Sequence, residues 1–97
     1  MPVLEKDIEA KVVKYAKERG CLVRKMNGLG FSGWPDRLFL LPDGKMFWIE
    51  FKSPVGKLSE GQRAMIDEIR QMGHVVFVVN DPEKGKAVVE AELGRRV

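Results

Sequence analysis

Two carboxylates and one lysine lie in or directly beside two apolar segments near the middle of the chain. Asp36 stands directly before the segment 37–41, while Glu50 and Lys52 belong to the segment 45–52. Both segments are rich in Phe, Leu, Ile and Trp, which is typical of β-strands. Because side chains of a strand alternate between its two faces, Glu50 and Lys52 share one face. Charged groups on strands of core composition therefore need an explanation, either as a site or as a solvated ion pair.

The turn between these segments brings the charged groups together. Pro42, Asp43 and Gly44 form a strong hairpin signal, since each residue type favours a tight turn. A loop centred on Asp43 predicts that Asp36 lies opposite or diagonal to Glu50. We therefore expect two carboxylates and one ammonium group to converge on one face of the sheet.

This combination of groups suits metal-assisted hydrolysis of a phosphodiester. Neighbouring carboxylates repel each other unless a cation lies between them. Mg²⁺ prefers oxygen ligands and keeps several waters. Lys52 would then orient or deprotonate the attacking water, or offset charge in the transition state. The alternative is that Asp36 begins a turn and that Glu50 and Lys52 form a solvated ion pair.

Two further positions have a functional and a structural interpretation. Glu5 and Glu9 lie one helical turn apart and flank the apolar stripe of the first predicted helix, so either can point past the core toward the sheet or remain a surface charge. Gln62 lies on the apolar face of a later helix, where an amide needs a partner. It either supports the site or closes a capping box with Ser59.

The elements that position these residues follow from hydrophobic periodicity and from glycine and proline stops. We expect helices at 4–20 and from Ser59 to about Met72, and a short last helix within 81–93. We expect strands at 21–26, 37–41, 45–52 and 74–80, with a glycine-rich loop at 27–33. The order is αβββαβα, an α/β fold with a mixed four-stranded sheet flanked by helices, in which the last strand lies parallel to a neighbour. We expect the run 74–80 to be core and Trp48 to pack under the first helix.

Length and composition limit the class of protein. The 97 residues suit a single domain, 1–97, and the formal net charge of +3 permits a nucleic-acid partner without requiring one. The single cysteine points to a reducing compartment. No apolar stretch approaches the length of a membrane span, so we expect a cytoplasmic protein that does not bind membranes.

The motifs resemble those of a known nuclease family. Asp36 in "PD", followed by "EFK" with Glu50 and Lys52, is similar to the PD-(D/E)XK nuclease signature. From about Leu4 to Val89 the chain resembles the VRR-NUC family, especially its small stand-alone members from phages and bacteria. The similarity includes the helix acids, the motif "GWPD" and the sequence "LSEGQ" that contains Gln62. The resemblance implies a restriction-endonuclease-like fold with an αβββαβ core.

The resemblance also implies a role for each matching residue. Asp36 and Glu50 would hold Mg²⁺ or Mn²⁺, with the main-chain carbonyl of Phe51 as a further ligand. Lys52 would assist the water that attacks the phosphodiester. The remaining two roles fall to a helix acid, which would contact the ion directly or through water, and to Gln62, which would brace the site. For the helix acid we prefer Glu9, because of its spacing from the Gly20 turn, over Glu5.

The family resemblance implies activity on branched DNA. Its members are described as metal-dependent, structure-selective nucleases, so we expect an endonuclease that cuts Holliday (four-way) junctions, as a homodimer in a bacterial or phage-infected cell. A twofold dimer would present two sites to a junction of near-twofold symmetry. The alternatives are a PD-(D/E)XK nuclease acting on flap or duplex DNA, a DNA-binding module without catalysis, and a structural domain.

Basic residues around the expected site are candidates for phosphate contacts. Such contacts would bind the DNA backbone without reading its sequence. The alternative for each is a solvated surface charge. The candidates are Arg24, Lys25, Arg37 and Lys57.

Overall fold

The computed structural model of the protein describes residues 3–28, 30 and 33–95, and part of the predicted glycine loop 27–33 lies outside these ranges. The described elements follow the predicted order, αβββαβα. Three helices and four strands are described: α1 (Glu5–Glu18), β1 (Leu22–Lys25), β2 (Arg37–Leu40), β3 (Met46–Phe51), α2 (Glu60–Gln71), β4 (Val76–Val79) and α3 (Pro82–Gly94). The last helix is longer than the short helix expected there. In the described residues no helix is long and apolar enough to cross a membrane.

The strands form one mixed sheet in the order β1-β2-β3-β4. β1 and β2 are antiparallel, as are β2 and β3, and β4 lies parallel to β3, as predicted. Arg37 is the partner of Ile49 in the hairpin, so the next pair outward along the same register joins Asp36 and Glu50. The register inferred from the Pro-Asp-Gly turn is therefore confirmed.

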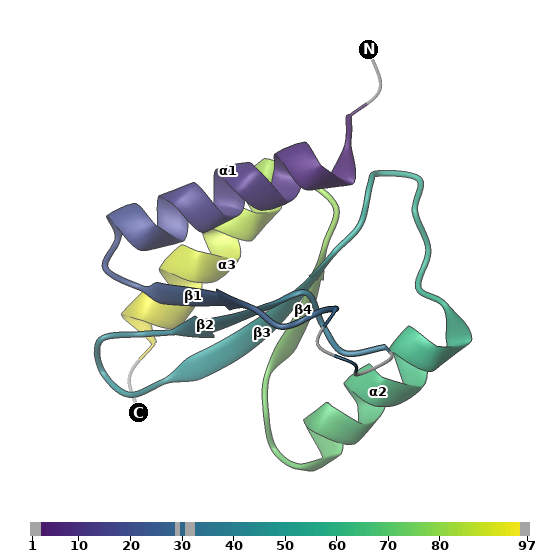
Figure 1. Ribbon diagram of the computed structural model, residues 1–97. Coiled ribbons are helices and arrows are strands. Elements are labelled where there is room, and N and C mark those ends of the chain that lie inside the picture. The colour runs from purple at the N-terminus through teal and green to yellow at the C-terminus, as the bar shows by residue number, and fades with distance from the viewer. Residues whose placement is uncertain (1–2, 29, 31–32, 96–97) are drawn as a thin grey trace.

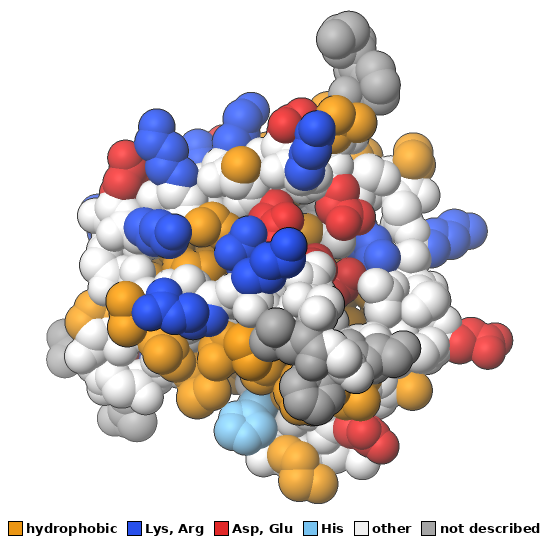
Figure 2. Space-filling view, in the orientation of Figure 1, with side chains coloured by type: hydrophobic (Ala, Val, Ile, Leu, Met, Phe, Trp, Pro, Cys, Tyr) orange, Lys and Arg blue, Asp and Glu red, His pale blue; other side chains and the backbone are white. Residues whose placement is uncertain are grey.

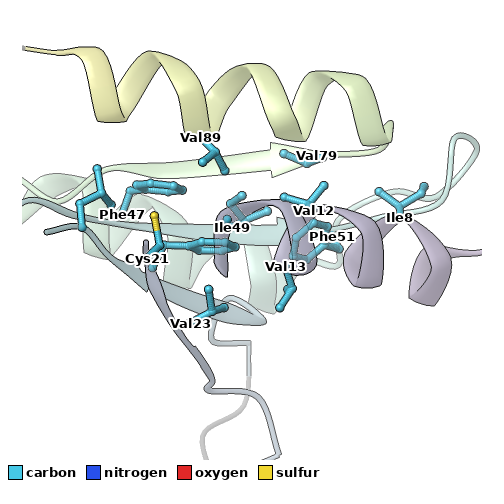
Figure 3. Close-up of a cluster of buried hydrophobic side chains, with 13 residues drawn as sticks. Ile8, Val12, Val13, Cys21, Val23, Phe47, Ile49, Phe51, Val79 and Val89 are labelled. Carbon is cyan, nitrogen blue, oxygen red and sulfur yellow. The ribbon is translucent and has the colours of Figure 1, made fainter. Parts of the chain in front are cut away.

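Helices α1 and α3 cover one face of the sheet, where the larger hydrophobic core lies (Figures 1 and 3). The apolar stripe of α1 is fully buried, with Ile8, Val12 and Ala16 packed against strand residues such as Phe51. Burying each large side chain contributes about 1.5–3 kcal/mol. Gly85 lets α3 approach α1, because a Cβ there would lie 2.3 Å from a methyl group of Val12.

Helix α2 packs on the opposite face, over β3 and β4. Ile66 and Ile69 contact Trp48 and Val76 in a smaller cluster. The prediction that Trp48 lies under the first helix is wrong, since Trp48 faces α2. The physical reason is that odd-numbered residues of β3 face α1, which leaves Trp48 and Glu50 on the other face.

The run 74–80 is only partly core. Val76 and Val79 are buried, whereas Val78 is 43% exposed. β4 is an edge strand, and Val78 is the register partner of Glu50, on the α2 side of the sheet but outside the cluster that α2 buries. The expectation of a wholly buried strand is therefore wrong at this position.

Candidate active site

Asp36 lies directly before β2, and its buried carboxylate accepts hydrogen bonds from two different segments. Its exposed fraction is 8%. Oδ2 accepts the main-chain N–H of Phe51 at 2.8 Å, and Oδ1 accepts Nδ2 of Asn27 at 2.7 Å. Each oxygen keeps a free lone pair, since a carboxylate has about four acceptor positions. The carboxylate is therefore fixed in place and still able to bind a cation.

Glu50 lies near the end of β3 and is almost fully buried, with an exposed fraction of 2%. Oε2 accepts Nε2 of Gln62 at 3.1 Å and lies 3.5 Å from Nζ of Lys52. Oε1 is buried, and no described residue hydrogen-bonds to it. A buried carboxylate oxygen without a protein partner is costly, so this atom could serve as a ligand for a cation.

Gln62 makes both kinds of contact that the sequence left open, and its role in a site stays a prediction. Its main-chain N–H donates to Oγ of Ser59, and its Oε1 accepts the Ser59 N–H, which completes the capping box of α2. Its Nε2 remains available and donates to Glu50. One side chain therefore caps α2 and ties that helix to the buried carboxylate.

Burial and neighbouring charges raise the pKa values of three acids at the site. The pKa of Glu50 is raised to about 7, mainly by burial and next by the charge of Asp36, while Lys52 opposes the increase. Burial also raises the pKa of Asp36, which the Phe51 hydrogen bond partly opposes. For Glu5, burial raises the pKa first and the charge of Asp36 next. A divalent cation would relieve this repulsion.

Glu5 and Glu9 both approach this group of charges from the start of α1. The charge of Glu5 raises the pKa of Glu50, and the charge of Glu9 raises that of Asp36. Glu9 itself is bound by Arg37, with Nε 2.7 Å from Oε2. Its predicted contact with an ion, and the preference for it over Glu5, both stay predictions.

The donor set fits a hard divalent cation. Asp36 and Glu50 supply carboxylate oxygens, one of them unpartnered. The N–H and C=O of one strand residue point to the same side, so the carbonyl of Phe51 faces the Asp36 side, as its N–H does. Within the described ranges, no three His, Cys, Asp or Glu side chains are grouped to hold a metal by themselves. Such a set suits an ion that retains waters, as Mg²⁺ does.

Three of the four predicted phosphate-binding residues lie at one corner of the sheet. Lys25 and Arg37 are register partners on β1 and β2 and share one face of the sheet. Arg24 precedes Lys25 on this edge strand, so its side chain points to the opposite face. Lys57 is exposed on the loop between β3 and α2. Near the centre of the molecular face in view, Figure 2 shows Lys and Arg side chains beside a group of acidic side chains.

One residue of the site was missed from the sequence. Asn27 holds Asp36, yet nothing in its spacing marks it, because it begins a glycine-rich segment without periodicity. Its sequence signal is its place shortly after β1 (Leu22–Lys25), with Met26 between them, because β1 pairs with the strand that follows Asp36.

Comparison with known proteins identifies the family. A sequence profile described as "VRR-NUC domain" matches residues 5–81. The chain belongs to the VRR-NUC family. The "Putative nuclease p44" of Acyrthosiphon pisum secondary endosymbiont phage 1 is 31% identical over 81 residues, which is 84% of this chain and 87% of that protein. These findings support a nuclease and confirm the resemblance seen in the motifs.

Two solved structures have the same fold. A "VRR_NUC domain" superposes with a TM-score of 0.70 at 38% identity, covering 86% of this chain and 95% of the other. A "VRR_NUC domain protein" superposes with a TM-score of 0.76 at 16% identity, covering 97% and 93%. The second likeness concerns the fold alone. Together they confirm the predicted restriction-endonuclease-like α/β architecture of this VRR-NUC chain.

Proposed function

We propose that this VRR-NUC protein is a Mg²⁺- or Mn²⁺-dependent endonuclease that hydrolyses phosphodiester bonds in branched DNA, with four-way junctions as its substrate. The observation that carries the proposal is the buried Glu50 carboxylate. Its Oε1 has no hydrogen-bond partner among the described residues, and the charge of Asp36 raises its pKa. A purely structural ion pair would satisfy its oxygens and would not gather two acids on one face.

The roles of the side chains follow from their contacts. When bound, the divalent cation supplies positive charge for phosphate oxygens and makes a water more acidic. Asp36, Glu50 and the Phe51 carbonyl would hold it, and Glu9 or Glu5 would contact it directly or through water. The Lys52 side chain is 15% exposed, so it is accessible to solvent while its Nζ also lies near the Glu50 carboxylate.

Lys52 is the group that acts on the attacking water. Its ammonium group lies 3.5 Å from Glu50 Oε2, close enough to share that oxygen with a water molecule. From there it orients the nucleophile or offsets the charge that develops on the phosphate. Nε2 of Gln62 donates to the same carboxylate oxygen at 3.1 Å, so this second contact also restrains the Glu50 side chain.

Basic residues at the corner of β1 and β2 support backbone contacts with DNA: Lys25 and Arg37 on one face of the sheet, and Arg24 on the other. Lys57 would add a contact from the loop between β3 and α2. Phosphate contacts of this kind position a duplex without reading its sequence. Arg37 would exchange its bond with Glu9 for one with a phosphate. Because its substrate would be DNA, the protein would act in the cytoplasm of a bacterial or phage-infected cell.

A homodimer is part of the proposal, and an uncovered sheet face supports it. Leu22, Leu40 and Met46 are register partners in one row across β1, β2 and β3, on the side of the sheet where α2 leaves them uncovered. Leu22 is 55% exposed, and Met72 at the end of α2 is 76% exposed. A second copy of the chain would bury this apolar surface and bring a second site to the junction.

Cleavage of labelled DNA tests the proposed activity. Purified protein is incubated with four-way, flap and linear duplex DNA in Mg²⁺, Mn²⁺ or EDTA. We expect cutting of the four-way junction that requires the metal and that disappears in Asp36→Ala and Glu50→Ala. Lys52→Met should lower the rate about 10²–10⁴-fold. The matched control is Lys17→Met, an exposed lysine at the far end of α1, which should cut normally.

The same assay separates the alternatives. Preferential cutting of flap or linear duplex DNA would replace the junction specificity with a general nuclease. Tight binding without cutting in any divalent ion would indicate a DNA-binding module. Light scattering tests the dimer: Leu22→Glu should shift the protein to a monomer that keeps its fold. A wild-type protein that is monomeric at high concentration would contradict the dimer.

A further inference from the structure

Two side-chain amides from different parts of the chain hold the two buried carboxylates. Gln62 donates to Glu50 at 3.1 Å, and Asn27 donates to Asp36 at 2.7 Å. The second oxygen of Asp36 accepts the Phe51 N–H at 2.8 Å. Because each oxygen of Asp36 has its own donor, the carboxylate cannot rotate or tilt without breaking a hydrogen bond.

The backbone next to Asn27 is anchored to the same residue. The main-chain N–H of Met26 donates to the carbonyl of Asp36 at 2.8 Å, which continues the ladder one step beyond the pair Lys25 and Arg37. Asn27 is the first residue after this ladder. Its side chain therefore reaches Asp36 from a fixed point of the sheet rather than from the middle of the glycine-rich segment.

A neutral amide is the donor that a cation site needs here. A Lys or Arg bound to Asp36 would cancel the charge that attracts the cation, whereas Asn27 orients the carboxylate and leaves its charge intact. Oδ1 of Asn27 is also buried, and no described residue hydrogen-bonds to it. A buried acceptor without a partner disfavours folding, so fold stability alone does not explain this side chain.

We propose that Asn27 is a positioning residue that orients the Asp36 carboxylate toward the divalent cation, an inference that rests on the proposed function. Groups that hold metal-binding carboxylates typically change metal affinity by about 10–100-fold when removed. Removal of the Asn27 amide should therefore weaken metal binding while DNA binding is unchanged. The free Oδ1 can in addition accept a hydrogen bond from a water of the hydrated ion.

Titration calorimetry with Mn²⁺ alone, without DNA, tests this role. The variants are Asn27→Ala and Asn27→Leu, the second of which keeps the side-chain volume and loses the donor. Gln71→Ala, an exposed amide at the far end of α2 from Gln62, is the matched control. Thermal unfolding in EDTA verifies that each variant folds. We expect about 10–100-fold weaker Mn²⁺ binding in both Asn27 variants and wild-type binding in Gln71→Ala.

Two further readouts separate positioning from a structural role. In the cleavage assay, raising the Mg²⁺ concentration should restore much of the rate of Asn27→Ala, and its affinity for junction DNA in EDTA should match that of the wild type. Asp36→Ala is included in the Mn²⁺ titration. If Asp36→Ala loses binding and both Asn27 variants keep wild-type affinity, the role of Asn27 is refuted and the proposed function stands. If Asp36→Ala binds Mn²⁺ normally, both fail together.

Discussion

The substitution Glu50→Gln should make the protein more stable at alkaline pH when no divalent metal is present. Burial raises the pKa of Glu50 from 4.5 to about 7, so the folded protein binds this proton more tightly than the unfolded chain does. The stabilisation from the protonated group is complete below pH 4.5 and is lost as the pH rises through about 7. Glu50→Gln keeps the shape of the protonated side chain but does not titrate, so it does not lose this stabilisation as the pH rises.

The size of the effect follows from the difference between the two pKa values. At about 1.36 kcal/mol per pH unit, the full difference corresponds to about 3 kcal/mol, and relaxation around the buried pair reduces it to about 1–3 kcal/mol. For a chain of this size, 1 kcal/mol changes the melting temperature by about 4–8 °C. Urea unfolding from pH 4 to pH 8.5 in EDTA measures the difference directly.

The comparison must be made between variants, because Asp36 and Glu5 also have raised pKa values and act in the same direction. The free energy of unfolding of Glu50→Gln minus that of the wild type should grow as the pH rises from 5 to 8. Added Mg²⁺ should remove most of this gap at pH 8 by stabilising only the wild type. Parallel pH curves for the two proteins in EDTA would refute the reasoning.

Three further predictions concern the groups around the site. Loss of the capping box in Gln62→Ala or in Ser59→Ala should lower the free energy of unfolding by about 1 kcal/mol. Only Gln62→Ala should also lower the cleavage rate, by about 10-fold or more, because Gln62 alone bonds to Glu50. Equal cleavage rates in the two variants would contradict this prediction. Gly33→Ala should destabilise more than Gly28→Ala in urea unfolding, because both glycines have positive φ but only at Gly33 would a Cβ lie 2.8 Å from a carbonyl oxygen of α2; equal losses would contradict that contact. Arg37→Ala should lower DNA affinity and reduce the salt dependence of binding by about one phosphate contact, measured by fluorescence anisotropy; an unchanged salt slope would exclude a phosphate contact.

The hairpin that carries the site could be predicted from local sequence. The Pro42–Gly44 turn determines the register of the hairpin, and the observed pairing of Arg37 with Ile49 agrees with it. Alternation also indicates that Glu50 and Lys52 share a face, which their distance of 3.5 Å confirms. Short-range turn chemistry and the period of a strand are properties of neighbouring residues, so they are readable without the fold.

Contacts between distant segments could not be predicted in this way. Alternation tells that Trp48 shares a face with Glu50, but the helix that covers this face depends on how the chain crosses the sheet. The exposure of Val78 depends on β4 being an edge strand. The hydrogen bond from Asn27 crosses a glycine-rich segment, and the pairing of Glu9 with Arg37 depends on the rotamers of two long side chains.

The most direct test of the central claim is a crystal structure of the protein soaked in Mn²⁺, with anomalous scattering measured to locate the ion. We expect one anomalous peak about 2.0–2.3 Å from an oxygen of Asp36 and from Oε1 of Glu50, and none there in crystals of Glu50→Gln. A peak elsewhere on the protein, with these two carboxylates unoccupied at saturating Mn²⁺, would contradict a metal-dependent active site at this position.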